Sequence, residues 1–234
     1  MCRPMRRVYD FLATLANNNN REWFNAHKDE YLQAQALFNG FVEQLVAAIG
    51  NWDEEILASG LQVKDCTYRI YRDTRFSKNK EPYKTHMGAY ICRGGKKSPY
   101  AGYYFHIEPG AADGFLGGSL LAAGLYCPDT AVIQSIRDEI SVNGDSFLNA
   151  IAEADGFKLE QYNKLKRVPR GFDDVEERWK ELLKYKDFSI GEPLSVDMLS
   201  APQLLDYVSE RFRKCRSFNN ILNLAVDYAL EQNS

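Results

Sequence analysis

Apolar residues recur at helical spacing near the N-terminus of the chain. They predict one helix from Met5 to Ala16 and a longer one from Asn19 to Ile49. Asn19 is the expected N-cap of the longer helix, with Glu22 three residues later as its capping-box partner. The apolar positions of the two helices are Val8, Phe11, Leu12 and Leu15, then Phe24, Tyr31, Phe38, Val42, Leu45 and Ile49. Each set lies on one side of its helix, so both helices are expected to pack against the core.

The C-terminal part of the chain shows the same spacing. It predicts helices from Thr130 to Ser141, from Asp145 to Ala154 and from Asp173 to Tyr185, the last capped by an aspartate at its start. The stretch from Ala201 to Gln232 is typical of two closing helices, with a break near Ser217. Helices are therefore expected at both ends of the chain.

The middle of the chain contains short segments rich in Tyr, Ile and Phe, separated by Gly, Pro and Lys. They predict strands at Cys66–Asp73, His86–Arg93 and Ala101–Glu108, and a fourth, weaker one at Phe115–Leu121. Lys186–Ile190 is a candidate for an added strand. Because no helix separates the first strands, the sheet is expected to be antiparallel.

These elements predict an α+β fold. An antiparallel sheet of about four strands in the middle of the chain would be packed by N-terminal and C-terminal helices. Hydrophobic residues make up 45% and charged residues 26% of the chain, which is typical of a globular protein and too apolar for a disordered one. No repeat, low-complexity tract or linker interrupts the pattern, so residues 1–234 are expected to form a single domain.

Composition also bears on the compartment. The N-terminal residues carry charge without the apolar run of a secretory signal, and no stretch approaches the ~18 consecutive apolar residues of a membrane span. The five cysteines are odd in number and widely spaced, which indicates free thiols in a reducing compartment. We therefore expect a cytoplasmic protein without membrane contact, disulfide, metal or cofactor.

Alternation along the strands sorts the predicted sheet into two faces. The expected core face consists of Tyr68, Ile70, Met87, Ala89, Ile91, Tyr103, Phe105 and Ile107. The expected polar face consists of Arg69, Tyr71, Asp73, His86, Tyr90, Cys92, Tyr104, His106 and Glu108. This second face holds two of the three histidines, so His86 or His106, with Asp73 or Glu108, are the candidate catalytic residues for proton transfer.

Positive charge is concentrated beside the same face. The segment from Lys64 to Lys97 holds ten basic and three acidic residues and carries +7, although the whole chain carries −3. Such a patch attracts anions locally without making the protein generally adhesive. The candidate ligand-binding residues are Arg69, Arg72, Arg75, Lys80, Tyr83, Lys84 and Tyr104. The alternative is a solvated basic loop in which Arg69 and Arg72 pair with Asp73 or Glu108.

Other sites find less support in the sequence. A zinc site would have to combine His86, Cys92 and His106, and no closely spaced ligand pair supports it. His27 lies four residues from both Trp23 and Tyr31, which indicates a packed, hydrogen-bonded histidine rather than a catalyst.

Four motifs of the chain resemble the uncharacterised family known as domain of unknown function 2461. They are Asn19–Phe24 with His27, Lys28 and Tyr31; Tyr68–Ser77 with Lys80 and Pro82–Lys84; Gly102–Tyr104; and Leu165–Phe172. The resemblance runs over nearly the whole chain and implies a single domain, but it implies no activity. The aspartate-histidine-proline step usual in the family is Asp174-Val175-Glu176 here, so no role of that histidine carries over.

Three functions fit these observations. The first is a site that binds a small ligand bearing phosphate or carboxylate, or that catalyses a reaction on it. The second is nucleic-acid binding, with Tyr71, Tyr90 and Tyr104 as stacking platforms beside the basic loop. The third is a protein-interaction module that docks an acidic partner. The net charge of −3 opposes the second function, so we expect nucleic acid to bind weakly at physiological salt.

Overall fold

An antiparallel five-stranded sheet forms the centre of the computed structural model, which describes residues 4–110, 116–161 and 163–232. The strands lie in the order β1-β2-β3-β5-β4. Their bounds are β1 Met87–Cys92, β2 Gly102–Ile107, β3 Leu120–Leu125, β4 Lys158–Leu159 and β5 Phe188–Pro193. The predicted α+β class with an antiparallel sheet between N-terminal and C-terminal helices is confirmed, with five strands rather than about four.

The N-terminal helices are α1 Pro4–Asn17, α2 Arg21–Ala26, α3 Lys28–Gly50, α4 Glu54–Ala58 and α5 Val63–Cys66. The predicted helix from Asn19 to Ile49 is therefore two helices, which meet at His27. The N-cap is Asn20, whose side chain accepts the backbone N–H of Trp23, and not Asn19. The ring of His27 stacks on Trp23 with centroids 4.1 Å apart, as a packed histidine should.

The C-terminal helices are α6 Thr130–Glu153, α7 Glu177–Leu183, α8 Val196–Leu199, α9 Leu204–Arg213 and α10 Arg216–Glu231. The two helices predicted before residue 154 form α6, in which the backbone leaves helical geometry at Asn143. Helix α7 begins four residues later than predicted. Phe172 is buried and its carbonyl accepts the N–H of Val175, so the residues before the helix form a turn. The break predicted near Ser217 separates α9 from α10 and lies just before Arg216.

Two predicted strands are wrong in position. Cys66–Asp73 is not a strand: Cys66 ends α5, and the following residues form only isolated bridges, Thr67 to Ala89 and Tyr71 to Tyr83. Pro82 lies in the pairing segment and has no N–H to donate, which prevents a regular ladder. The fourth strand starts at Leu120 instead of residue 115, after two glycines with positive φ.

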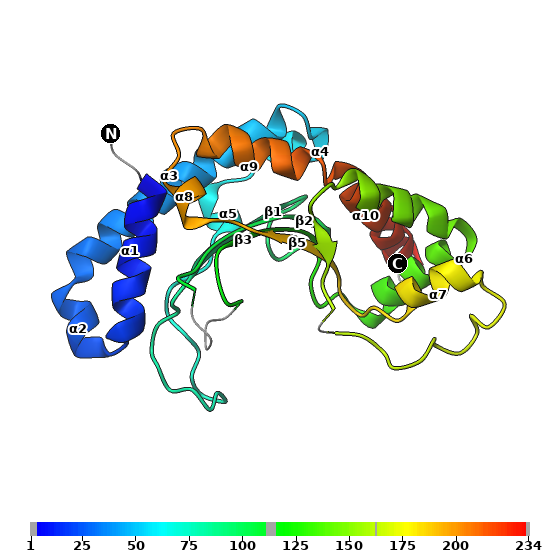
Figure 1. Cartoon of the computed structure of the whole chain (residues 1–234), viewed down its shortest axis with the longest axis horizontal. Helices are drawn as coiled ribbons and strands as arrows, with labels where there is room; N and C mark the ends of the chain where they lie inside the picture. Colours follow the sequence, from blue (N-terminus) through cyan, green and yellow to red (C-terminus); the bar gives the residue numbers. More distant parts are fainter. Residues whose placement is uncertain (1–3, 111–115, 162, 233–234) are drawn as a thin grey trace.

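One face of the sheet packs on helices, which Figure 1 shows above it. The predicted core residues of β1 and β2 are buried on this face: Met87, Ala89, Ile91, Tyr103, Phe105 and Ile107. Phe105 lies between two rings of α3, with centroids 6.1 Å from Phe38 and 4.9 Å from Phe41. Burying each such side chain contributes about 1.5–3 kcal/mol. Tyr68, which was predicted for this face, is 46% exposed instead.

Candidate functional site

The opposite face of the sheet carries no helix layer among the described residues (Figure 1). Strand pairing aligns Tyr90, Tyr104, Ala122, Gly191 and Lys158 in one row across the five strands. Directly paired residues point to the same side of a sheet, so this row lies on the uncovered face. Tyr90, Tyr104, Ala122 and Gly191 are partly exposed, whereas the core residues beside them are buried. The uncovered face therefore carries two tyrosines beside two small residues.

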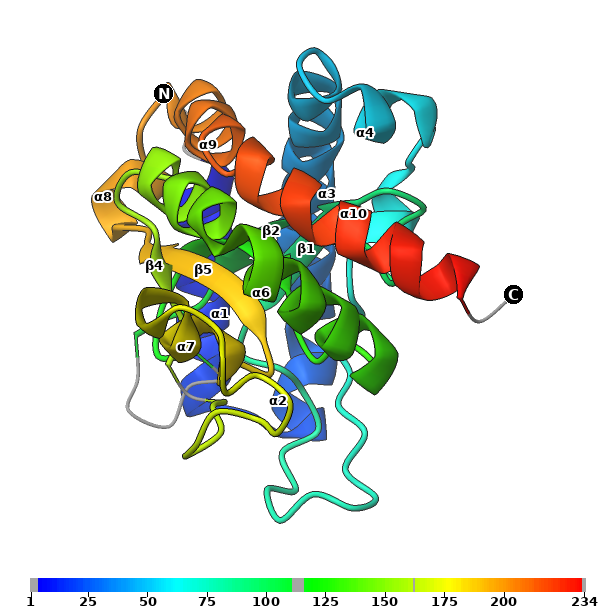
Figure 2. The ribbon, with the colours of Figure 1, turned by 90° about the vertical axis from the view of Figure 1, so that its right-hand side faces the viewer.

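A long hairpin, residues 68–84, projects beside this face and is here called the basic hairpin (Figures 1 and 2, teal). Its two arms pair through the N–H of Arg72 with the carbonyl of Pro82 and the N–H of Lys84 with that of Ile70. The Asn19 side chain holds it by donating to the Tyr83 carbonyl at 2.9 Å and accepting the Tyr83 N–H at 3.2 Å. The position of the hairpin thus depends on the turn between α1 and α2.

Packing also anchors the hairpin where it leaves the sheet. The Tyr83 ring is buried and stacks on Phe24 with centroids 3.8 Å apart. Ile70 is buried beside it in the same core. Tyr83 therefore supports the hairpin from inside, which differs from the ligand contact predicted for it.

At the tip of the hairpin, residues 73–81, Arg75 and Lys80 have partners within the tip. Arg75 donates two hydrogen bonds to the Asp73 carboxylate, at 3.0 and 2.6 Å. Lys80 donates to the Thr74 carbonyl at 2.9 Å. These side chains are exposed, and ion pairs of this kind contribute little to stability. The tip is therefore largely compensated and solvated.

The cations at the foot of the hairpin, residues 68–72 and 82–84, have different surroundings. Lys84 is partly buried, and its pKa is lowered by burial first and then by the Arg69 and Arg72 guanidinium groups. Arg72 lies 3.4 Å from Glu81. Within the described ranges, neither Arg69 nor Lys84 has a carboxylate at ion-pair distance. The foot thus holds three cations close together, and the acid that pairs with Arg72, Glu81, lies at the adjoining end of the tip.

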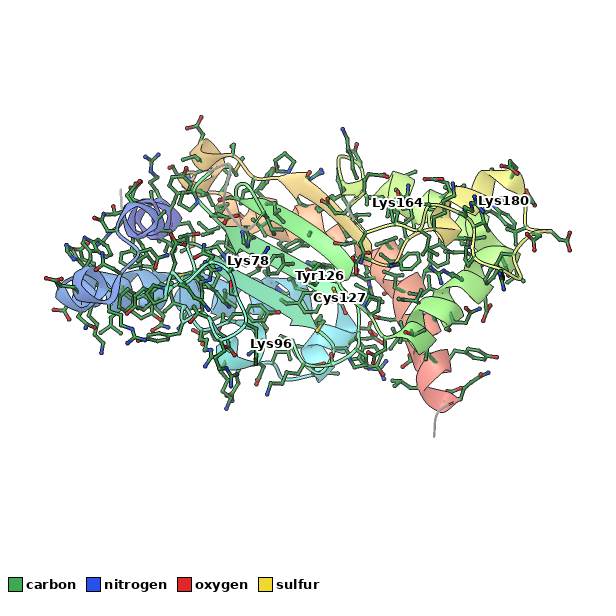
Figure 3. All side chains as sticks on the ribbon, turned by 90° about the horizontal axis from the view of Figure 1, so that it is seen from below. Lys78, Lys96, Tyr126, Cys127, Lys164 and Lys180 are labelled. Atoms are coloured by element: carbon green, nitrogen blue, oxygen red, sulfur yellow. The ribbon has the colours of Figure 1, made fainter. Side chains whose placement is uncertain are left out.

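Tyr68 adds an aromatic surface to this cluster. Its ring lies 5.5 Å from the Lys84 ammonium and 5.9 Å from that of Lys96. A cation over a tyrosine ring gains on the order of 0.5–1 kcal/mol at an exposed site. Figure 3 views the uncovered face directly, with Lys78 and Lys96 on one side and Tyr126 at the end of β3.

A hydrogen-bonded line runs inward from Tyr104 along β2. The Tyr104 hydroxyl lies 2.8 Å from Nδ1 of His106, and Nε2 of His106 lies 3.2 Å from Oε2 of Glu108. His106 and Glu108 are 0% and 1% exposed, whereas Tyr104 reaches the uncovered face. A Cβ atom at Gly88 would collide with the Tyr104 hydroxyl, so glycine at position 88 leaves room for it.

Backbone groups fix the inner end of this line. Oε2 of Glu108 accepts the N–H of Leu116 at 2.8 Å. The Ser119 hydroxyl accepts the Glu108 N–H and donates to the Glu108 carbonyl, both at 3.0 Å. Leu116 thus holds the side chain of Glu108, and Ser119 holds its main chain.

His86 connects the line to the hairpin. Its ring centroid lies 5.0 Å from that of His106. The pKa of His86 is lowered to about 3, by burial first and then by His106, Lys84 and Arg72, with Glu108 opposing them. His86 is therefore a neutral imidazole near neutral pH. The charges acting on it show that the foot cations and the inward line face the same space.

The structure brings together seven of the predicted site residues: Arg69, Arg72, Lys84, His86, Tyr104, His106 and Glu108. Asp73, Arg75 and Lys80 lie apart from them at the hairpin tip. The predicted sharing of one face by Asp73 and Glu108 is wrong, because residues 67–73 do not form a strand of the sheet. Asp73 pairs with Arg75, and neither Asp73 nor Glu108 pairs with the foot cations at the distances of an ion pair.

The geometry also bears on two alternative roles of this face, stacking on Tyr90 and a metal site at Cys92. The Tyr90 hydroxyl lies at hydrogen-bond distance from the carbonyls of Tyr100 and Gly124, which ties this side chain to the fold. The Cys92 thiol lies against the Gly95 carbonyl and the Ser98 hydroxyl. In the part of the chain that the structure describes, no three His, Cys, Asp or Glu residues are grouped to hold a metal ion.

A second basic segment begins at β4 on the same face and was missed from the sequence. Residues 158–170 carry five basic residues and one acid: Lys158, Lys164, Lys166, Arg167, Arg170 and Glu160. Lys158 closes the row of Tyr104, and Glu160 lies over Gly191, 2.7 Å from where a Cβ would stand. Burial raises the pKa of Glu160. The charge count of this segment, a net +4, was the available signal.

The fold and the site define an α+β protein with a cationic cluster and a buried Tyr–His–Glu line on one sheet face. The chain belongs to the family described as conserved hypothetical protein (DUF2461), whose model matches residues 7–220. This confirms the family indicated by the four sequence motifs. No curated protein and no solved structure matches the chain. Among the described residues, no helix has the length and apolar character needed to cross a membrane.

Proposed function

We propose that the protein binds, or acts on, a small phosphate- or carboxylate-bearing ligand at the uncovered sheet face. The observation that carries this proposal is the foot of the hairpin, where Lys84 is held partly out of water beside two guanidinium groups. Like charges in partly desolvated surroundings oppose each other's ionisation. A bound anion would remove this cost, so the cluster is suited to binding a negatively charged group.

The residue types fit an oxyanion. A guanidinium presents a planar fork that matches two oxygens of a phosphate or carboxylate, and an ammonium adds a point charge. Arg72 and Lys84 come from opposite arms of the hairpin, so one ligand can contact both. Tyr68 and Tyr104 offer aromatic surface and a hydroxyl beside them.

Groups suited to proton transfer lie next to this cluster. His86 is neutral and faces His106, whose Nε2 contacts Glu108. A neutral imidazole and a carboxylate-supported imidazole are common participants in general acid–base catalysis. Catalysis on the bound ligand is therefore part of the proposal, with His86, His106 and Glu108 as its residues.

The test is ligand-dependent melting. Phosphate, sulfate, nucleotides and dicarboxylates are screened with the wild type, Arg72→Ala, Lys84→Ala and Lys97→Ala. A ligand that binds only the folded state raises the melting temperature by mass action, on the order of 2.7 kcal/mol at a hundredfold excess over Kd. We expect the rise in the wild type and in Lys97→Ala, whose lysine is exposed on a turn, and its loss in the other two. No shift in the wild type with any of these anions would contradict the proposal.

A longer polyanion is the second candidate, favoured by Lys158, the first cation of the second basic segment, on the far side of the same face. Lys158 stands at the opposite end of the row that contains Tyr104, three strands away or about 14 Å. The remaining chain is strongly acidic, so we expect nucleic-acid affinity to be weak at physiological salt. Fluorescence anisotropy with single-stranded and duplex oligonucleotides measures it. Tight binding that falls steeply with salt would favour this candidate over the first.

A further inference from the structure

The direction of the hydrogen bonds along the Tyr104–His106–Glu108 line, from donor to acceptor, determines whether Tyr104 presents a donor or an acceptor to a ligand. Oε2 of Glu108 accepts the N–H of Leu116, which marks this oxygen as an acceptor. Nε2 of His106, 3.2 Å from the same oxygen, is therefore the ring nitrogen that carries a proton and donates it. The hydrogen bond at the inner end of the line keeps its direction. Only the bond between Nδ1 of His106 and the Tyr104 hydroxyl can therefore reverse its donor and acceptor.

Nδ1 has two states with opposite consequences for Tyr104. When His106 is neutral, Nδ1 accepts the O–H of Tyr104, and the tyrosine turns its lone pairs toward the uncovered face. When Nδ1 gains a proton, it donates to the Tyr104 oxygen across the same 2.8 Å, and the O–H of Tyr104 turns outward. Only the second state offers a hydrogen-bond donor to an anion.

The surrounding charges favour the same coupling. The titratable groups around His106 and Tyr104 are Glu108 just after β2, His86 before β1, Tyr68 on the hairpin and Tyr126 after β3. Arg72 and Lys84 on the hairpin act on His86, and Glu160 lies over Gly191, two strands from Tyr104. The hairpin cations Lys84 and Arg72 oppose a positive charge on His86, whose ring lies beside that of His106, and Glu108 contacts Nε2 of His106. A bound anion neutralises the cations, so it makes protonation of His106 more favourable.

We propose that Tyr104 is the specificity-determining contact of the anion site and that the site takes up one proton, on Nδ1 of His106, when the anion binds. This inference rests on the proposed anion-binding function. The proton comes from solvent and forms the Nδ1–H bond; Tyr104 keeps its own proton and reorients it toward the ligand. His86 is not the group that takes it up near neutral pH, because burial lowers the pKa of His86 to about 3.

Linkage makes the effect measurable. If the anion favours the protonated site, protons favour the anion-bound site by the same factor. Affinity for an oxyanion should rise on the order of tenfold between about pH 8 and about pH 6, the range in which imidazoles change charge. Sulfate is the suitable probe, because its own charge is constant over this range and the pH dependence then reports the protein.

The experiment is calorimetric titration of the full chain with sulfate in two buffers that differ in ionisation enthalpy. The difference in heat gives the number of protons taken up. We expect uptake by the wild type and by Tyr126→Phe, an exposed tyrosine at the end of β3. Tyr104→Phe should bind sulfate more weakly, with no uptake and no pH dependence. Glu160→Gln should retain the uptake, which separates His106 from Glu160, a carboxyl group on this face whose pKa is raised by burial.

Nitrogen NMR of the wild type with labelled histidine observes the proton directly and does not depend on any variant folding. Addition of sulfate should move Nδ1 of His106 to the protonated form. Sulfate binding without proton uptake, or uptake that is lost in Glu160→Gln and kept in Tyr104→Phe, would overturn the coupling and leave the anion site intact. Absence of sulfate binding by the wild type at either pH would overturn the anion site itself.

Discussion

The foot and the tip of the basic hairpin carry the same residue types in different surroundings. At the tip, Arg75 forms a fork with Asp73 two residues away and Lys80 donates to a nearby carbonyl. At the foot, Lys84 is partly buried beside two guanidinium groups. The comparison shows that the number of cations in a segment does not say how many of them are compensated by nearby groups. What matters is which cations are partly removed from water without a local carboxylate.

The largest expected effect concerns the line that the foot cations face. Glu108→Ala leaves the N–H groups of Leu116 and His106 without their buried acceptor, and should lower the free energy of unfolding by about 3 kcal/mol or more. Asp73→Ala removes the corresponding acid at the exposed tip and should leave stability unchanged. Urea denaturation of both variants measures the difference. Equal effects would erase the distinction between the two regions.

The next effect is a pH dependence that comes from His86. Its pKa is lowered from 6.5 to about 3, by burial first and then by His106, so the unfolded chain binds a proton that the folded chain does not. Stability should therefore fall as pH falls from 6.5 toward 3, by on the order of 2–3 kcal/mol at about pH 4. His86→Asn should flatten this part of the curve, as followed by denaturant unfolding at several pH values. A wild type equally stable throughout this range would contradict the prediction.

The connection between the hairpin and the N-terminal helices predicts a smaller change. Asn19→Ala removes two hydrogen bonds to the Tyr83 backbone and should cost about 1–2 kcal/mol. Asn79 makes two comparable bonds to Glu81 at the exposed tip, and Asn79→Ala should cost less than about 0.5 kcal/mol. Asn19→Ala should also weaken anion binding, because it loosens the foot. Thermal melting with and without phosphate checks both points.

The smallest effect has the opposite sign. Lys84→Met removes a cation whose pKa lies below 10.5 in the folded protein, because of burial first and then of Arg69 and Arg72, so the unliganded variant should be slightly more stable than the wild type. The wild type should gain stability as pH rises toward 10.5, and Lys84→Met should not. Lys78→Met at the exposed tip is the control and should change neither property. Destabilisation by Lys84→Met would mean that the ammonium has a favourable partner.

Local pattern was sufficient where neighbouring residues decide the outcome. Alternation along β1 and β2 placed Tyr104, His106 and Glu108 on one face, and pairing of Tyr90 with Tyr104 confirms that face. Helix α1 follows from its apolar spacing. The strand predicted at Cys66–Asp73 failed because a strand needs a partner ladder, and the partner contains Pro82.

The amino-acid sequence by itself determined the α+β class, the family, the composition of the two faces of β1 and β2, and the presence of a basic segment. Each of these depends on residue type and on spacings of a few residues. Only the tertiary structure decided which face of the sheet stays uncovered, which cations lack a carboxylate and which acid His106 contacts. Those outcomes depend on distant segments: Asn19 holds Tyr83 from 64 residues away, and β4 brings Lys158 into the row of Tyr104. Long-range packing of this kind leaves no local pattern, because the contacting residues satisfy each other only after the chain has folded.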